Sequence, residues 1–128
     1  ETFEMLRPDH CDVVFGVPAY EPGWEMDAFA NNVRVISERR IRGEVHFCSA
    51  QSAPAAEQVL VNIKASLGAE ERLFVAPIGT KPHGVAAAVF AAANQGVGIL
   101  YDHPAKRAKR SVGTRRWHCY QVEQRLTL

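Results

Sequence analysis

The sequence predicts a three-layer α/β domain in which helices cover a mainly parallel sheet of about five strands. Short apolar runs rich in β-branched residues alternate with segments whose apolar residues recur at helical spacing. Glycine, proline and hydroxyl residues stand at the boundaries between these segments. Strands that alternate with helices of this length pair in parallel through right-handed crossovers. Because the chain has 128 residues, we expect a single domain over residues 1–128.

The first predicted strand is the apolar run at residues 12–18, and the helix after it begins at Glu25. Acidic residues stand in the first turn of that helix and basic residues in its last, as the helix dipole favours. Gly43 closes the helix. The apolar residues that recur at helical spacing are Met26, Phe29, Val33 and Ile36.

The second predicted strand covers residues 44–49, and Ser52 is placed to cap a second helix. Pro54 suits the first turn of that helix, and Gly68 ends it. Residues 73–77 form the third predicted strand, residues 82–94 an alanine-rich third helix, and residues 98–101 the fourth strand. Residues 117–122 are predicted to form a last strand.

Residues 78–83 place a glycine turn, a hydroxyl, a cation and an imidazole at the start of the third predicted helix. Gly79 lets the backbone approach a ligand closely, and Thr80 is predicted to cap the helix. Lys81 adds its charge to the positive helix end, and His83 adds a ring that stacks or donates. This combination predicts a site for phosphate or a nucleotide. The plainer interpretation is a well-capped helix whose Lys81 and His83 face water.

Other polar and aromatic residues are predicted to converge on this turn, because open parallel sheets bind ligands beyond the carboxyl ends of their strands. The residues expected to bind the ligand are Tyr20, Glu21 and Trp24 after the first strand, Ser49 and Gln51 after the second, Gly79, Thr80, Lys81 and His83 after the third, and Asp102 and Arg107 after the fourth. The sequence assigns no catalytic residue, and Lys81 and His83 are the candidates for one.

Charge is distributed unevenly along the chain, although the formal net charge is only +1. Residues 106–116 carry six positive charges and no acid, whereas the rest of the chain has more acidic than basic residues. A compact basic loop close to the predicted site indicates a polyanionic ligand. A solvated loop is the alternative.

The chain has three cysteines, an odd number at wide spacing, which argues against a disulfide framework and for a reducing, cytoplasmic location. Each cysteine has a histidine close by, but no Cys-x-x-Cys or His-x-x-x-His pair is present, so we expect no metal site and no cofactor. No apolar run reaches transmembrane length, and no membrane partner is expected. The chain begins without methionine, and we expect it to be a piece of a longer protein.

The sequence Phe-Val-Ala-Pro-Ile-Gly-Thr-Lys-Pro-His-Gly-Val-Ala-Ala-Ala-Val-Phe-Ala-Ala at residues 74–92, followed by Gly-Ile-Leu-Tyr-Asp at 98–102, resembles a conserved segment of CARF domains, the CRISPR-associated Rossmann fold. Ile78 stands where that family usually has glycine, and His83 where methionine is common. The resemblance to CARF and the related SAVED domains implies a Rossmann-like fold and a homodimer. It also implies a sensor that binds a cyclic oligonucleotide and regulates a fused or separate effector in antiviral defence.

Carried onto this chain, the resemblance implies that Gly79, Thr80 and Lys81 hold a phosphate and ribose, while the loop at residues 20–24 flanks a base. Some members of the family cleave their ligand slowly, and Lys81 or His83 would assist such a reaction here.

Two other functions remain open. The first is a small nucleotide- or nucleoside-processing enzyme, with Glu21 or Asp102 as acid or nucleophile and His83 or His103 as proton carrier. Phosphate-binding loop, dinucleotide-binding and nucleophile-elbow motifs are absent from the sequence. The second is an interaction domain of a DNA-processing or defence protein, whose basic loop contacts a nucleic-acid backbone.

Overall fold

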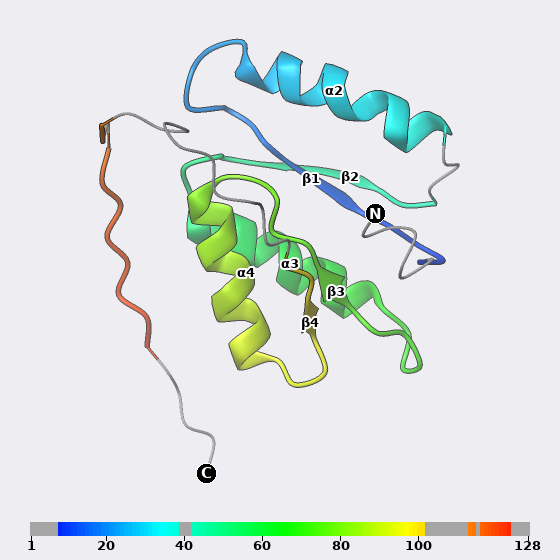
Figure 1. The fold of residues 1–128 in the computed structure, drawn as a ribbon. Helices are drawn as coiled ribbons and strands as arrows, with labels where there is room; N and C mark the ends of the chain where they lie inside the picture. Colours follow the sequence, from blue (N-terminus) through cyan, green and yellow to red (C-terminus); the bar gives the residue numbers. More distant parts are fainter. Residues whose placement is uncertain (1–7, 39–41, 102–112, 115, 124–128) are drawn as a thin grey trace.

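Figure 1 shows the computed structural model of the chain, which describes residues 8–38, 42–101, 113–114 and 116–123. The elements in chain order are β1 (Val13–Gly16), α2 (Trp24–Glu38), β2 (Val45–Cys48), α3 (Ala53–Ser66), β3 (Phe74–Val75), α4 (Lys81–Ala93) and β4 (Gly98–Ile99). The three helices occupy the segments in which helices were predicted, to within a few residues at each end.

The strands form two separate parallel pairs within the described part of the chain. In the first pair, β1 and β2 run side by side with Val13 opposite Val45 and Gly16 opposite Cys48. In the second pair, β3 and β4 are joined at only two positions, with Phe74 opposite Gly98. The prediction of a three-layer Rossmann-like domain with a parallel sheet of about five strands is therefore wrong.

The predicted sheet does not form because β3 and β4 are short, with two residues each in the pair. β3 has two residues, whereas five were predicted, and the chain leaves it through Ile78, which is 83% exposed. The predicted strand at 117–122 is also wrong, because residues 116–123 form no strand. Its alternating pattern reflects side-chain contacts of the chain with the domain rather than a hydrogen-bonded ladder.

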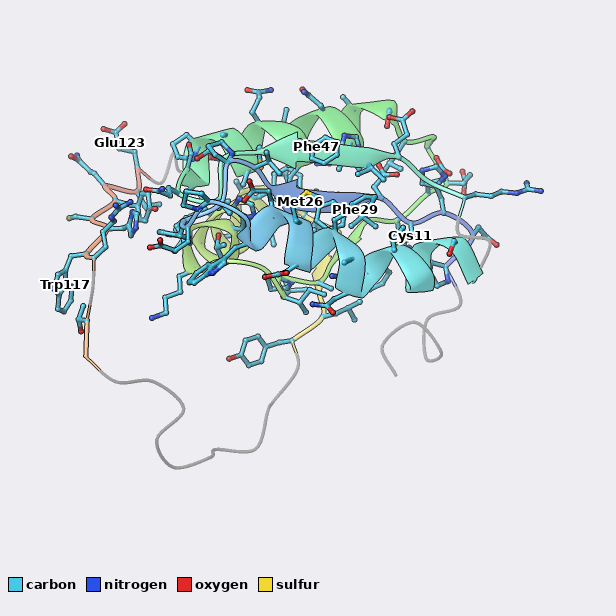
Figure 2. All side chains as sticks on the ribbon, turned by 90° about the horizontal axis from the view of Figure 1, so that it is seen from above. Cys11, Met26, Phe29, Phe47, Trp117 and Glu123 are labelled. Carbon is cyan, nitrogen blue, oxygen red and sulfur yellow. The ribbon has the colours of Figure 1, made fainter. Side chains whose placement is uncertain are left out.

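Side chains of the β1–β2 pair alternate between two layers, with α2 on one face and α3 and α4 on the other (Figure 1). Phe15 points toward α2, where its ring lies 5.7 Å from that of Phe29. On the opposite face Cys48 packs with buried alanines of α3 and α4. The ring of Phe47, labelled with Phe29 in Figure 2, lies 6.1 Å from that of Phe15.

Two further features explain why α3 and α4 form and pack together. The Ser52 hydroxyl accepts a hydrogen bond from the Ala55 amide at 3.2 Å, which confirms the predicted cap of α3. Ala87 of α4 is 2% exposed, so its small side chain lets the two helices approach closely. Phe90 of α4, 1% exposed, packs with Leu60 of α3 in the second part of the core.

Candidate functional site

The turn before α4 lies against the loop that follows β2, although β2 and β3 belong to separate strand pairs. The Thr80 hydroxyl donates a hydrogen bond to the Ala50 carbonyl oxygen at 2.7 Å. The His83 Nε2 atom lies 2.9 Å from the Ser49 carbonyl oxygen. Two residues of the predicted turn, 79–83, therefore contact two consecutive residues of the predicted loop.

Thr80 stands at the N-cap position of α4 but does not cap it through its side chain. The prediction that its hydroxyl accepts from a helical amide is therefore wrong, because the side chain is held toward Ala50 and accepts no hydrogen bond from the helix. The first-turn amides of α4 are left without a side-chain acceptor from the cap. Lys81, the first residue of the helix, is exposed beside them.

The imidazole of His83 is half-buried, and its Nε2 atom faces the end of β2 and the loop after it. A carbonyl oxygen only accepts, so the Nε2 atom facing Ser49 carries the hydrogen and donates it. The Sγ atom of Cys48 lies 3.6 Å from the same nitrogen. Burial raises the pKa of the Cys48 thiol, so this thiol stays protonated and is a poor nucleophile.

Gln51, which follows Ala50 in the loop after β2, belongs to a cluster of five side chains that we call the Tyr20 cluster. The Tyr20 hydroxyl lies 3.1 Å from the His118 Nε2 atom. The Arg116 guanidinium donates to Gln51 Oε1 and lies 5.9 Å from the centre of the Tyr20 ring. The rings of His118 and Tyr120 are nearly parallel, with centres 6.2 Å apart. The members of the cluster are Tyr20, Gln51, Arg116, His118 and Tyr120.

Tyr120 anchors this cluster to the core. Its ring packs against the buried group formed by Cys48, Ala53, Ala56 and Ala86. Its hydroxyl oxygen is buried without a hydrogen-bond partner. Burial raises the pKa of Tyr20, the nearby Tyr120 raises it further, and Arg116 opposes both effects.

The other residues predicted to bind the ligand lie in the turn itself, in the loop after β1, at the start of α2 or outside the described residues. Gly79 is exposed in the turn, and Glu21 is half-buried in the loop after β1. Trp24 begins α2 and is 57% exposed. Asp102 and Arg107 lie outside the described residues, as do His103 and most of the basic loop.

Sequence reasoning missed His118 and Tyr120 as site residues because residues 117–122 were assigned to a strand. The available signal was the concentration of ring-bearing residues directly after the basic loop, in Trp-His-Cys-Tyr at 117–120. Figure 2 shows Trp117 pointing away from the body of the domain, and it is 88% exposed. The rings two residues apart, at His118 and Tyr120, are the ones that contact the domain.

A second group of titratable side chains lies at the opposite end of the β1–β2 pair. The Asp12 carboxylate accepts a hydrogen bond from the Glu44 amide at 2.8 Å and lies 2.8 Å from His10 Nε2 and 3.1 Å from His46 Nε2. Burial raises the pKa of Asp12, but these hydrogen bonds outweigh burial, and the pKa lies below its ordinary value. This group holds the beginnings of β1 and β2 together and is separate from the predicted site.

A groove of about 600 Å³ lies near the other end of α3 and α4, at the beginnings of β3 and β4. Lys64, Arg72 and Phe74 are among the residues that line it. None of the predicted ligand-binding residues that the structure describes lines this groove. Within the part of the chain that the structure describes, no three His, Cys, Asp or Glu side chains are grouped so as to hold a metal ion.

No protein-family model, curated protein or solved structure matches this chain. Among the described residues, no helix is both long and apolar enough to cross a membrane. The resemblance to CARF domains therefore stays a prediction from residues 74–92 and 98–102. A functional assignment depends on the geometry of the turn and of the Tyr20 cluster.

Proposed function

We propose that the domain binds a nucleotide, with a phosphate at the first turn of α4 and a base beside Tyr20. The observation that carries this proposal is the N-terminus of α4, where the Thr80 hydroxyl is committed to Ala50 and does not cap the helix. An anion is the natural acceptor for uncapped first-turn amides, and the helix dipole favours it further. The exposed ammonium of Lys81 supplies a mobile charge at the same position.

The base side of the proposed site comes from the loop after β2 and the loop after β1. Gln51 directly follows Ala50, the residue to which Thr80 is bonded. Arg116 links Gln51 to the face of the Tyr20 ring. An aromatic face next to an amide suits a nucleobase, which stacks through its plane and forms hydrogen bonds through its edge.

The ligand class we propose is the one implied by the resemblance of residues 74–92 and 98–102 to CARF domains, a cyclic oligonucleotide that acts as a second messenger. In this proposal the domain works as a homodimeric sensor that regulates an attached effector in antiviral defence. A cyclic ligand with repeated nucleotides presents several phosphates and bases, which suits two copies of one site related by a two-fold axis. Sedimentation of the protein with and without the ligand tests the dimer.

His83 has a structural contact through one of its two ring nitrogens. Its Nε2 atom donates to the Ser49 carbonyl, so the ring holds the loop against α4. In this tautomer the Nδ1 atom carries no hydrogen and is the nitrogen able to accept a proton. Chromatography of the ligand after incubation with the protein distinguishes nucleotide processing from binding alone.

A thermal-shift titration with cyclic tetra-adenylate, AMP and inorganic phosphate tests the proposal. A ligand that binds only the folded state stabilises it by about 2.7 kcal/mol at one hundred times its Kd. Lys81→Ala should weaken nucleotide binding by roughly 10- to 150-fold, because one charge-assisted contact is lost. Arg72→Ala, which removes an exposed charge beside the distant groove, is the matched control and should bind normally. Absence of any shift with all three probes would refute nucleotide binding.

A further inference from the structure

Residues 116–120 cross the surface that Tyr20 and Gln51 form, and we call them the strap. They contain no helix or strand. Alternate side chains make their contacts: Arg116 with Gln51, His118 with Tyr20, and Tyr120 with the core. Trp117 and Cys119, between them, are exposed. The strap is thus held to the domain by three side chains.

Arg116 contacts the two groups to which the proposed nucleobase would bind, the Tyr20 ring and the Gln51 side-chain amide. Its guanidinium lies over the Tyr20 ring, 5.9 Å from the ring centre, and donates to the Gln51 side-chain oxygen. A guanidinium is planar and rich in donors, so it uses the same ring face and the same amide as a base does. A base cannot stack on this face of Tyr20 while Arg116 remains there.

We infer that the strap is autoinhibitory, and that a nucleotide must displace Arg116 from Tyr20 and Gln51 before its base can bind. This inference rests on the proposed function and adds regulation of the same site. The contacts of Arg116 are exposed, so their loss is tolerable. A contact between an exposed cation and a ring, together with one exposed hydrogen bond, reduces the apparent affinity of a competing ligand by about 3- to 10-fold.

Tyr120 affects the strap in the opposite direction to Arg116. Its buried hydroxyl has no hydrogen-bond partner, which disfavours the position in which the strap lies against the domain. Tyr120→Phe removes that hydroxyl and keeps the ring on the core. This variant should hold the strap more firmly and weaken nucleotide binding, whereas Arg116→Ala should release the strap and strengthen it.

The test is a calorimetric titration of cyclic tetra-adenylate into the wild-type protein, Arg116→Ala, Tyr120→Phe and the Arg72→Ala control. We expect about 3- to 10-fold tighter binding to Arg116→Ala, weaker binding to Tyr120→Phe, and no change in the control. Equal or weaker binding to Arg116→Ala would overturn the inference, because Arg116 would then be neutral or a ligand-binding cation.

A measurement without ligand separates this inference from the proposed function. Trypsin cleavage between Arg116 and Trp117, followed by mass spectrometry, reports how often the Arg116 side chain leaves the domain. Gln51→Ala should accelerate this cleavage several-fold, and an unchanged rate would show that the strap is not held there. Faster cleavage without binding of any nucleotide would refute the proposed function, and with it autoinhibition, while leaving the strap itself demonstrated.

Discussion

Thr80 gives the sharpest test of how the turn is built. An N-capping threonine should be improved by aspartate, whose carboxylate accepts from the helix amides and favours the positive helix end. In this structure the Thr80 hydroxyl instead donates to Ala50, and a carboxylate cannot donate. Thr80→Asp would bring two acceptors together beside a residue that is 2% exposed. We therefore expect Thr80→Asp to destabilise the domain.

The magnitude follows from the groups left without partners. Leaving the Ala50 carbonyl unsatisfied costs about 1–3 kcal/mol, whereas a favourable helix-dipole contact contributes about 0.3–1 kcal/mol. The net loss is about 1–2 kcal/mol, which lowers the Tm of a domain of this size by roughly 3–10 °C. Thr80→Val, which has the same shape but no donor, should lose a similar amount.

Urea unfolding followed by circular dichroism measures these differences at neutral pH. Thr80→Ser is the control, because it keeps a hydroxyl at the same position and should remain within about 0.5–1 kcal/mol of the wild-type protein. If Thr80→Asp is more stable than the wild-type protein, the side chain caps α4 and the assignment of its hydrogen bond to Ala50 is refuted.

Three further changes test other parts of the structure. Gly16→Ala should destabilise the domain by about 1–3 kcal/mol in urea unfolding, because the added Cβ would lie 2.8 Å from the Ala50 Cβ. Phe90→Ala should cost about 3–5 kcal/mol in the same assay, since Phe90 is 1% exposed. Asp12→Asn should cost about 1–2 kcal/mol at pH 7, where the carboxylate accepts hydrogen bonds from the Glu44 amide and His46, and the cost should be smaller at pH 3.

The sign of the Asp12 effect follows from its lowered pKa. The carboxylate contributes its full stabilisation above the pKa of an unfolded aspartate, about 3.9, and loses it as the pH falls through the lower folded value. An equal difference between wild type and Asp12→Asn at both pH values would contradict this role. A loss below about 1 kcal/mol for Gly16→Ala or Phe90→Ala would contradict the packing described for Ala50 and the core.

The helices were predictable because their determinants are local. The Ser52 cap, the alanine-rich sequence of α4 and the acidic first turn of α2 all act within a few residues of themselves. The sheet was not predictable to the same degree, because pairing depends on residues far apart in the chain. Short apolar runs at 73–77 and 98–101 indicate strands, but they do not determine how many residues pair or whether two pairs join.

In the candidate site, too, some features could be predicted from the sequence and others could not. The loop after β2 was predicted to lie near the turn before α4, and the structure places Ser49 and Ala50 of that loop in contact with the turn. The use of each polar group does not follow from residue types, since Thr80 donates where it was predicted to accept. The contacts of Tyr20 with His118, 98 residues apart in sequence, had no local determinant.

The most direct test of nucleotide binding at the start of α4 is a nuclear magnetic resonance titration with cyclic tetra-adenylate. Backbone amide resonances of Lys81 and His83 should move with increasing ligand, because their amides belong to the proposed phosphate site. The amide of Gly68, at the end of α3 beside the distant groove, should stay unchanged. Saturable shifts at Lys81 and His83 are the predicted result. Stationary resonances there, or shifts confined to the groove around Gly68, would contradict the proposed site.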